Sequence, residues 1–296
     1  MEMLLEVQYH NNAMSNLIVT VWNVEHGSSI YAVTPNGRKA FLDCGSSSEF
    51  SPAKHVNPDY EKKKLDYLVI THPHQDHITD LPTVIEKFDI KTLRRNKIIT
   101  KEVMLDDNPD VFDPPNDEII GGYFDLVARF TKDVEWENDP SNPSWGNGCT
   151  FHSFNNDDTS LGVNNLSVAT FIEFGGETIL QGGDLEEKGW EELLKSDSFK
   201  KHLKNTTMLL ASHHGNDSGY CQKIFDYFSP KITIFSAGKY IDDNARNKYV
   251  QQTKGMKVRS ISRGEEDRWV LTTRKDGHIK IVIYPDPSIE PKITID

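Results

Sequence analysis

The stretch ITHPHQDHITD, residues 70–80, places three histidines and an aspartate within six consecutive positions. It follows KKKLDYLVI, which ends in an apolar run typical of a buried strand, and it precedes a segment with helical apolar spacing. A strand-to-helix loop is anchored at both ends, so its side chains can converge. Imidazole nitrogens and carboxylate oxygens suit zinc and also serve manganese or iron. The pattern therefore predicts that His72 and His74 face one metal ion, while Asp76 and His77 face a neighbouring one.

Length and composition narrow the class of protein. The chain has 296 residues, 36% hydrophobic and 26% charged, so it can bury a substantial core. Its formal net charge of −12 argues against broad electrostatic capture of nucleic acid or of an anionic membrane, because such proteins normally carry a basic surface. No stretch approaches the roughly 20 apolar residues of a membrane span, and the first residues do not resemble a signal peptide. We expect a cytoplasmic protein with no membrane partner, and three cysteines without a CxxC pair fit a reducing compartment.

The order of the predicted elements favours an α/β fold. A polar tail over residues 1–16 precedes three strand-like segments within residues 17–44, which we expect to form a meander. Later in the chain strands alternate with helices, including a helix expected over residues 218–228. This mixture predicts two sheets packed face to face with helices outside, a four-layer αββα sandwich, in a single domain over residues 17–296.

Residues 102–163 differ from the rest of this domain. The stretches DDNPDVFDPPNDE and ENDPSNPSWGNG are acidic and rich in proline and asparagine, and they flank a short helix expected around residues 119–131. We interpret the segment as an insertion over the core. Its role stays open between a lid, a specificity surface, a dimer contact and the contact for a protein partner.

The histidine cluster and its distant partners resemble a known family. HPHQDH, residues 72–77, resembles the HxHxDH signature of the metallo-β-lactamase-like hydrolases. In that family's order follow LQGGD, which ends in Asp184 and resembles the loop of the metal-bridging aspartate, and ASHHGN, which resembles the late histidine motif. The resemblance is closest to the hydrolase domain of the competence DNA-uptake channel and its free-standing relatives. Outside the insertion it covers roughly residues 17–284, through VWNVEHGSSIYAVTPNGRKAFLDCG, NNLSVATFIEFGGETILQGGDLEE, SPKITIFSAG and TTRKDGHIKI.

The resemblance implies a metallo-β-lactamase fold that uses two divalent metal ions, zinc or manganese, and a hydroxide between them for hydrolysis. The family's metal ligands match these residues: His72, His74, Asp76, His77, Asp184 and His214. Asp184 would bridge the two ions. Asn164, or water, would complete the shell of the ion held by His72 and His74.

The catalytic residues implied by the resemblance are Asp76, His213 and His214. Adjacent histidines point in different directions, so one can bind metal while the other protonates a leaving group or binds substrate. We choose His214, which precedes the glycine, as the metal ligand, and His213 stays a metal or substrate contact.

Further residues surround this expected centre. We expect Asp43 to orient a histidine ligand, since ligating imidazoles usually donate their other N–H to such a carboxylate, and Ser167 is a weaker candidate for a similar contact. The family's Gly-Gln-Gly-Asp turn appears here as residues 25–28, Glu-His-Gly-Ser. His26 therefore stays open as a metal or substrate contact. The remaining histidines are assigned to the surface or to structural roles: His10, His55, His152, His202 and His278.

Three classes of function compete. The leading prediction is a phosphodiesterase, most specifically a deoxyribonuclease, because the resembling branch acts on or is coupled to DNA. The acidic composition suits a small phosphodiester better than DNA, so a small phosphodiester is the second predicted substrate. Hydrolysis of a lactone, thioester or lactam is disfavoured by Asn164, where such relatives usually carry a third histidine. A non-catalytic module, stabilised by metal and binding a protein partner, is the third class.

Overall fold

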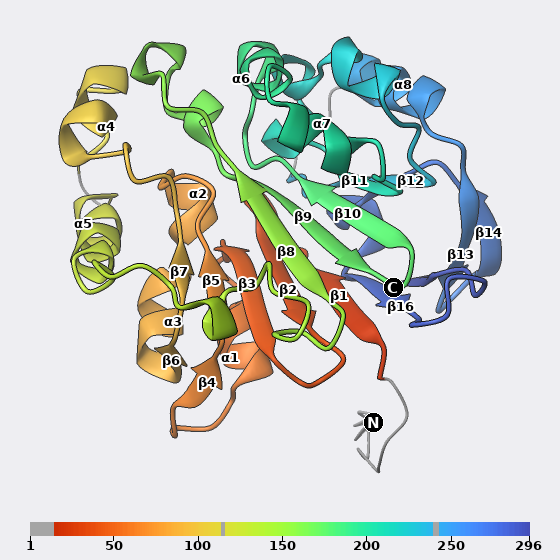
Figure 1. Cartoon of the computed structure of the whole chain (residues 1–296), viewed down its shortest axis with the longest axis horizontal. Helices are drawn as coiled ribbons and strands as arrows, with labels where there is room; N and C mark the ends of the chain where they lie inside the picture. Colours follow the sequence, from red (N-terminus) through yellow and green to blue (C-terminus); the bar gives the residue numbers. More distant parts are fainter. Residues whose placement is uncertain (1–14, 114–115, 239–242) are drawn as a thin grey trace.

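The computed structural model describes residues 15–113, 116–238 and 243–296. Two sheets pack face to face and helices cover the outer side of each (Figure 1). The predicted αββα sandwich is therefore confirmed. Most of the expected N-terminal tail, residues 1–14, lies outside the described residues, and so does His10.

A nine-stranded sheet forms the first layer. Its strands run in the order β14 (Gly264–Arg268), β13 (Met256–Ser260), β17 (Lys292–Ile295), β16 (Ile279–Ile283), β1 (Leu17–Val21), β2 (Ser29–Val33), β3 (Lys39–Cys44), β5 (Tyr67–Val69) and β7 (Leu93–Arg94). The expected meander of β1, β2 and β3 is antiparallel, as predicted. β3 then pairs in parallel with β5, with Leu42 opposite Val69. This register brings Asp43 beside the residues that lead into the histidine cluster.

A six-stranded sheet forms the second layer. Its strands run in the order β15 (Val270–Thr272), β12 (Ile232–Phe235), β11 (Met208–Leu210), β10 (Glu177–Gln181), β9 (Ala169–Phe174) and β8 (Thr150–Phe154). β9 and β10 form an antiparallel hairpin, whereas β10, β11, β12 and β15 are parallel. The carboxyl ends of parallel strands meet at one edge of a sheet, where such folds place their binding sites. The loops after β10 and β11 therefore open on the same edge.

Helices and short elements complete the layers. The α-helices are α1 (Pro52–Val56), α2 (Gln75–Ile78), α3 (Leu81–Lys87), α4 (Lys101–Asp107), α5 (Asn116–Val127), α6 (Glu187–Leu193), α7 (Asp197–Leu203), α8 (Asp243–Gln252) and α9 (Thr273–Asp276). β4 (Lys63–Leu65) pairs with β6 (Phe88–Ile90) in a separate small sheet. Single 3-10 turns are η1 (Trp136–Asn138), η2 (Thr159–Leu161), η3 (Asn164–Leu166) and η4 (His213–Gly215).

The helix expected over residues 218–228 was wrong. The segment forms two 3-10 turns instead, η5 (Asp217–Gly219) and η6 (Gln222–Asp226). Its backbone lies against the preceding loop. This approach is so close that a Cβ atom on Gly219 would come 2.4 Å from the carbonyl oxygen of Ser212. This close approach explains why a tertiary contact overrides the local helical spacing.

The segment over residues 102–163 contributes to the core and to a sheet. The side chains of Met104, Ile120, Tyr123 and Trp145 are buried in the apolar clusters, and β8 forms an edge of the six-stranded sheet. Burying a large apolar side chain stabilises a fold by roughly 2 kcal/mol. The segment is therefore packed into the body of the protein, and its helix α5 begins and ends three to four residues earlier than expected.

Two compositional expectations bear on the described residues. None of the described helices is long and apolar enough to cross a membrane. Cys44, Cys149 and Cys221 are buried and form no disulfide. Burial, together with Asp80 and Asp43, holds the pKa of the Cys44 thiol well above its usual range, so this cysteine is an unreactive core residue at neutral pH.

Candidate metal centre

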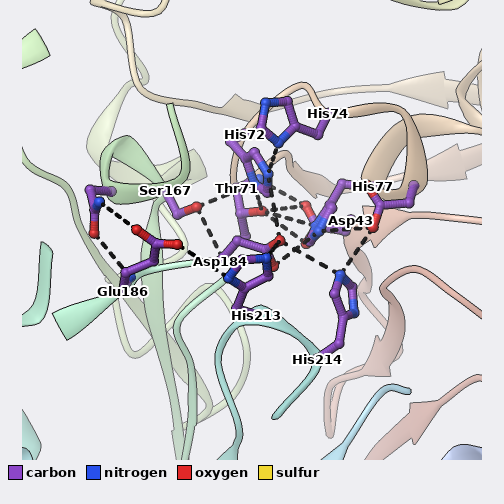
Figure 2. Close-up of polar contacts among 12 residues, drawn as sticks. Asp43, Thr71, His72, His74, His77, Ser167, Asp184, Glu186, His213 and His214 are labelled. Carbon is purple, nitrogen blue, oxygen red and sulfur yellow. Dashed lines mark hydrogen bonds and ion pairs between the residues drawn. The ribbon is translucent and has the colours of Figure 1, made fainter. Parts of the chain in front are cut away.

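Side chains from four segments converge at one edge of the sandwich (Figure 2). His72 follows β5, and the short helix α2 carries Asp76 and His77. Asp184 follows the turn after β10, and His214 lies in the turn after β11. The parallel pairings of β3 with β5 and of β10 with β11 explain why residues as far apart as His72 and His214 meet here.

The carboxylate of Asp184 lies in the middle of four imidazole rings. Its Oδ1 is 3.1 Å from Nε2 of His77. Its Oδ2 lies 3.6 Å from Nε2 of His214, 3.8 Å from Nε2 of His213 and 3.9 Å from Nε2 of His72. Asp184 is buried, with 4% of its surface exposed. One buried carboxylate therefore faces four imidazole nitrogens.

Two of these nitrogens have no hydrogen-bond partner among the residues that the structure describes. They are Nε2 of His77 and Nε2 of His214, and both are buried. Yet they lie 3.1 Å from Asp184 and 3.0 Å from Asp76, respectively. Buried polar atoms are nearly always hydrogen-bonded, so both need another partner. Nitrogens placed beside carboxylates without bonding to them are arranged as ligands of a shared cation, and the residues present fit a divalent metal ion.

Asp43 fixes the orientation of His77. Its fully buried carboxylate lies 2.8 Å from Nδ1 of His77, and it accepts hydrogen bonds from the backbone N–H of Thr71 at 2.8 Å and from Nε2 of Gln181 at 3.0 Å. A carboxylate at Nδ1 holds the proton there and leaves Nε2 as the acceptor. In its neutral form the ring therefore directs the lone pair of Nε2 toward Asp184, as a metal ligand requires.

The other two inner histidines are held in a comparable way. Nδ1 of His214 donates to the carbonyl oxygen of Ser236 at 2.8 Å, which again leaves Nε2 facing the centre. Nδ1 of His72 lies 3.2 Å from Oγ of Ser167, and that hydroxyl also accepts the backbone N–H of Asp184 at 3.1 Å. Ser167 thus links the histidine loop to the aspartate loop.

The backbone is strained at the centre. Asp43, His213 and His214 adopt positive φ angles of 55°, 51° and 56°. Residues with side chains rarely occupy this left-handed region, at a cost of order 1 kcal/mol or more each, and such strain is often found at functional sites. Gly183 also has a positive φ, and a Cβ there would meet the side chain of Thr71 at 2.7 Å.

Mutual charge interactions shift the pKa values of the buried groups. Burial by itself would lower the pKa of His77, but the carboxylates of Asp184, Asp43 and Asp76 outweigh it and raise that pKa well above its usual range. Burial would raise the pKa of Asp184, but His77 and His214 hold it well below its ordinary value. The carboxylate is therefore ionised at neutral pH.

The other two histidines of the signature remain neutral. Burial, with help from His77 and His74, lowers the pKa of His72 well below its ordinary value. The pKa of His74 is lowered by burial and by His77. Nδ1 of His74 lies 3.0 Å from Nε2 of His72. Neutral imidazoles are the form that binds metal.

The structure also brings together residues that the sequence left open. Two compact sets each have ligand atoms within 4.8 Å of one another: His72, His77 and Asp184, and His26, Asp76 and His214. His77 therefore lies close to His72, which was predicted to bind the other ion. His26 joins the second set, and its Nε2 lies 3.5 Å from Asp76.

Asn164 and the adjacent Asn165 make different contacts. The buried Oδ1 of Asn164 has no hydrogen-bond partner among the described residues. The adjacent Asn165 instead accepts the backbone N–H groups of Glu186 and Gly189, which holds the start of α6. Glu186 in turn lies 3.5 Å from Nδ1 of His213. Asn165 and Glu186 were not singled out from the sequence; an acid two positions after Asp184 was the available signal.

A sequence profile of the metallo-beta-lactamase superfamily matches residues 24–238, more than half of the chain. The chain belongs to the metallo-beta-lactamase superfamily. Members of this superfamily are generally metal-dependent hydrolases, and they typically bind divalent metal ions. The match spans all four segments that carry the histidines and aspartates described above.

Individual relatives extend this comparison. The chain is 25% identical over 245 residues to ComE operon protein 3 of Bacillus subtilis (strain 168). The aligned region covers 75% of this chain but only 28% of that protein. Two solved superfamily-like structures are more distant in sequence. A proposed metal-dependent hydrolase from Parabacteroides distasonis ATCC 8503 is 15% identical, with a TM-score of 0.42, over 77% of this chain and 87% of that one. An archaeal metallo-beta-lactamase superfamily protein from Sulfolobus tokodaii is 13% identical, with a TM-score of 0.38, over 81% and 86%.

Proposed function

We propose that this hydrolase is a phosphodiesterase with two divalent metal ions, zinc or manganese, and most specifically a deoxyribonuclease. The observation that carries the proposal is the buried carboxylate of Asp184 among four imidazoles, two of which present unpartnered nitrogens. DNA is proposed as the substrate because the sequence motifs resemble the hydrolase domain of the competence DNA-uptake channel; the chain is also 25% identical to ComE operon protein 3 over 28% of that protein.

The proposed ligands divide around Asp184, which both ions would share. His72 and His74 would complete the first shell, and their facing nitrogens lie 3.0 Å apart. The proposed ligands of the second ion are Asp76, His77 and His214. His26 is a candidate for an additional nitrogen, since it approaches Asp76 in a turn where the family carries a different sequence. When bound, the two ions would activate water and offset negative charge that develops on the phosphoryl group.

His213 is the proposed proton donor to the leaving oxygen. About 23% of its side chain is exposed, so a substrate can reach it, and its Nε2 lies 3.8 Å from Asp184 at the edge of the centre. Nδ1 lies 2.9 Å from Oγ of Ser218 and 3.5 Å from Glu186. These contacts can orient the ring so that Nε2 faces a substrate at the centre.

A small phosphodiester is the second candidate substrate. The formal net charge of −12 repels a long polyanion, whereas a small ester experiences less of this repulsion. Both candidates use the same centre and differ only in how the substrate reaches it.

The test measures the release of acid-soluble nucleotide from single- and double-stranded DNA with added Mn²⁺, beside hydrolysis of a chromogenic small phosphodiester. The wild type would be compared with Asp184→Asn and His214→Gln, and with His55→Gln as a control at an exposed histidine outside the centre. We expect the activity of both centre variants to fall by at least about 100-fold, because metal catalysis is lost. The activity of the control variant is expected to equal that of the wild type.

Three outcomes separate the candidates. DNA cleavage that is lost in both centre variants supports the nuclease. Cleavage of the small ester alone, with the same dependence on Asp184, overturns the nuclease in favour of the second candidate. Activity that is equal in all four proteins, or absent toward both substrates, contradicts phosphodiester hydrolysis at this centre.

A further inference from the structure

A second group of metal-binding side chains lies at the opposite end of the six-stranded sheet. His152 is on the edge strand β8, Glu173 is on β9 and His202 is on α7. Glu173 pairs with Thr178 near the start of β10, whereas Asp184 follows the end of that strand. The group therefore has no residue in common with the metallo-beta-lactamase centre. Both of its histidines were expected at the surface or in structural roles.

The three side chains converge on one point. Oε1 of Glu173 lies 2.6 Å from Nδ1 of His202, and Oε2 lies 3.8 Å from Nε2 of His152. The ligand atoms of all three lie within 4.8 Å of one another. An ordinary ion pair with Glu173 needs only one imidazole. Here a second imidazole is placed on the other carboxylate oxygen, with the two rings stacked at 4.3 Å.

The surroundings hold the two rings in place. His202 packs against Phe154 and Phe171, with ring centroids 5.6 Å and 5.5 Å apart. Nε2 of His152 lies 3.1 Å from Oγ1 of Thr150, so a neighbouring hydroxyl also positions this ring.

The group is also accessible to an ion from solvent. The side chains of His152, Glu173 and His202 are 26%, 27% and 17% exposed. An open groove of about 620 Å³ runs beside them and is lined by His152 and Glu173 together with Thr150 and Asn205. An ion held by the three side chains would therefore have a route of entry and room for water as a further ligand.

We propose that His152, Glu173 and His202 form a separate binding site for a divalent transition-metal ion such as zinc. Two imidazoles and one carboxylate are a donor set that zinc commonly takes, with an open position left for water. The bound ion would link α7 to the outer strands β8 and β9. The proposal does not depend on the catalytic function of the other centre.

The test measures zinc content per chain by mass spectrometry after equilibration of the full-length protein with buffered zinc. We expect His152→Gln and Glu173→Gln each to lose one zinc ion relative to the wild type, while His55→Gln loses none. Asp184→Asn removes zinc from the other centre, so its loss adds to that of His152→Gln in the double variant. Phosphodiester cleavage is expected to be unchanged in His152→Gln.

Equal zinc content in the wild type, His152→Gln and Glu173→Gln would overturn the proposal and leave the group as an ion pair. His152 is partly exposed on an edge strand, so its variant tests the site even where a change at His202 disturbs the packing of α7. An anomalous diffraction peak at the zinc edge, between Glu173 and the two rings, is the second expected result. Failure of DNA cleavage would leave both measurements unaffected.

Discussion

Asp43→Asn tests how strongly the protein itself organises the centre. The substitution keeps the size of the side chain but replaces one carboxylate oxygen with an amide group that donates. Three N–H groups donate to Asp43: the backbone N–H of Thr71, Nδ1 of His77 and Nε2 of Gln181; the hydroxyl of Thr71 also lies 3.0 Å from both carboxylate oxygens. Either orientation of the asparagine therefore sets a donor against a donor at 2.8–3.0 Å.

The metal affinity is expected to fall where the amide nitrogen takes the place of Oδ2, because His77 then relieves the conflict by changing its tautomer. A proton moved from Nδ1 to Nε2 lets Nδ1 accept from the amide, but Nε2 then has no lone pair for a metal. Loss of such a supporting contact typically costs about 10- to 100-fold in metal affinity, or about 1.4–2.8 kcal/mol. The metal-free fold is expected to lose about 1–3 kcal/mol from the unsatisfied buried donor.

The assay is isothermal titration of the metal-free protein with Zn²⁺ or Mn²⁺, with urea unfolding of the same samples. The matched control is Asp66→Asn, because Asp66 is also buried and accepts the backbone N–H of Lys39 at 3.0 Å, and no contact with a described histidine is present. We expect both variants to lose stability and only Asp43→Asn to lose metal affinity. An Asp43→Asn protein that binds metal within twofold of the wild type would refute the tautomer argument.

Three further predictions concern the same centre. His213→Gln is expected to keep the metal content but to lower the turnover of substrates with poor leaving groups by about 10²- to 10⁴-fold, measured against a nitrophenyl ester that needs no proton; an equal loss on both substrates would contradict the proton-donor role. The pKa values of His77 and His214 are raised, so protons compete with the metal at pH values above the usual histidine pKa of about 6.5. Zinc affinity is therefore expected to keep rising with pH in this range, and an affinity that does not change with pH there would contradict the prediction. Gly183→Ala is expected to destabilise the fold by about 1–3 kcal/mol in urea unfolding, because its φ is +57° and the added Cβ would lie 2.7 Å from the side chain of Thr71.

The local pattern of residues 70–80 was sufficient to predict a metal-binding loop between a strand and a helix. The three strand-like segments within residues 17–44 were likewise sufficient to predict the meander of β1, β2 and β3. These features depend on neighbours in the chain, so they can be read from spacing. The helix expected over residues 218–228 failed because the backbone of Gly219 is pressed against Ser212, a contact that spacing does not report.

The sequence by itself determined the types of ligand, the order of the motifs and the αββα class, because these depend on residue chemistry and on short-range periodicity. Only the tertiary structure decided which side chains meet. The register of β3 with β5 sets Asp43 on His77, the turn after β11 forces two histidines into positive φ, and β8, β9 and α7 bring His152, Glu173 and His202 together. Such proximities depend on strand pairing between distant segments, whose closure is driven by the shared apolar core rather than by the ligands themselves.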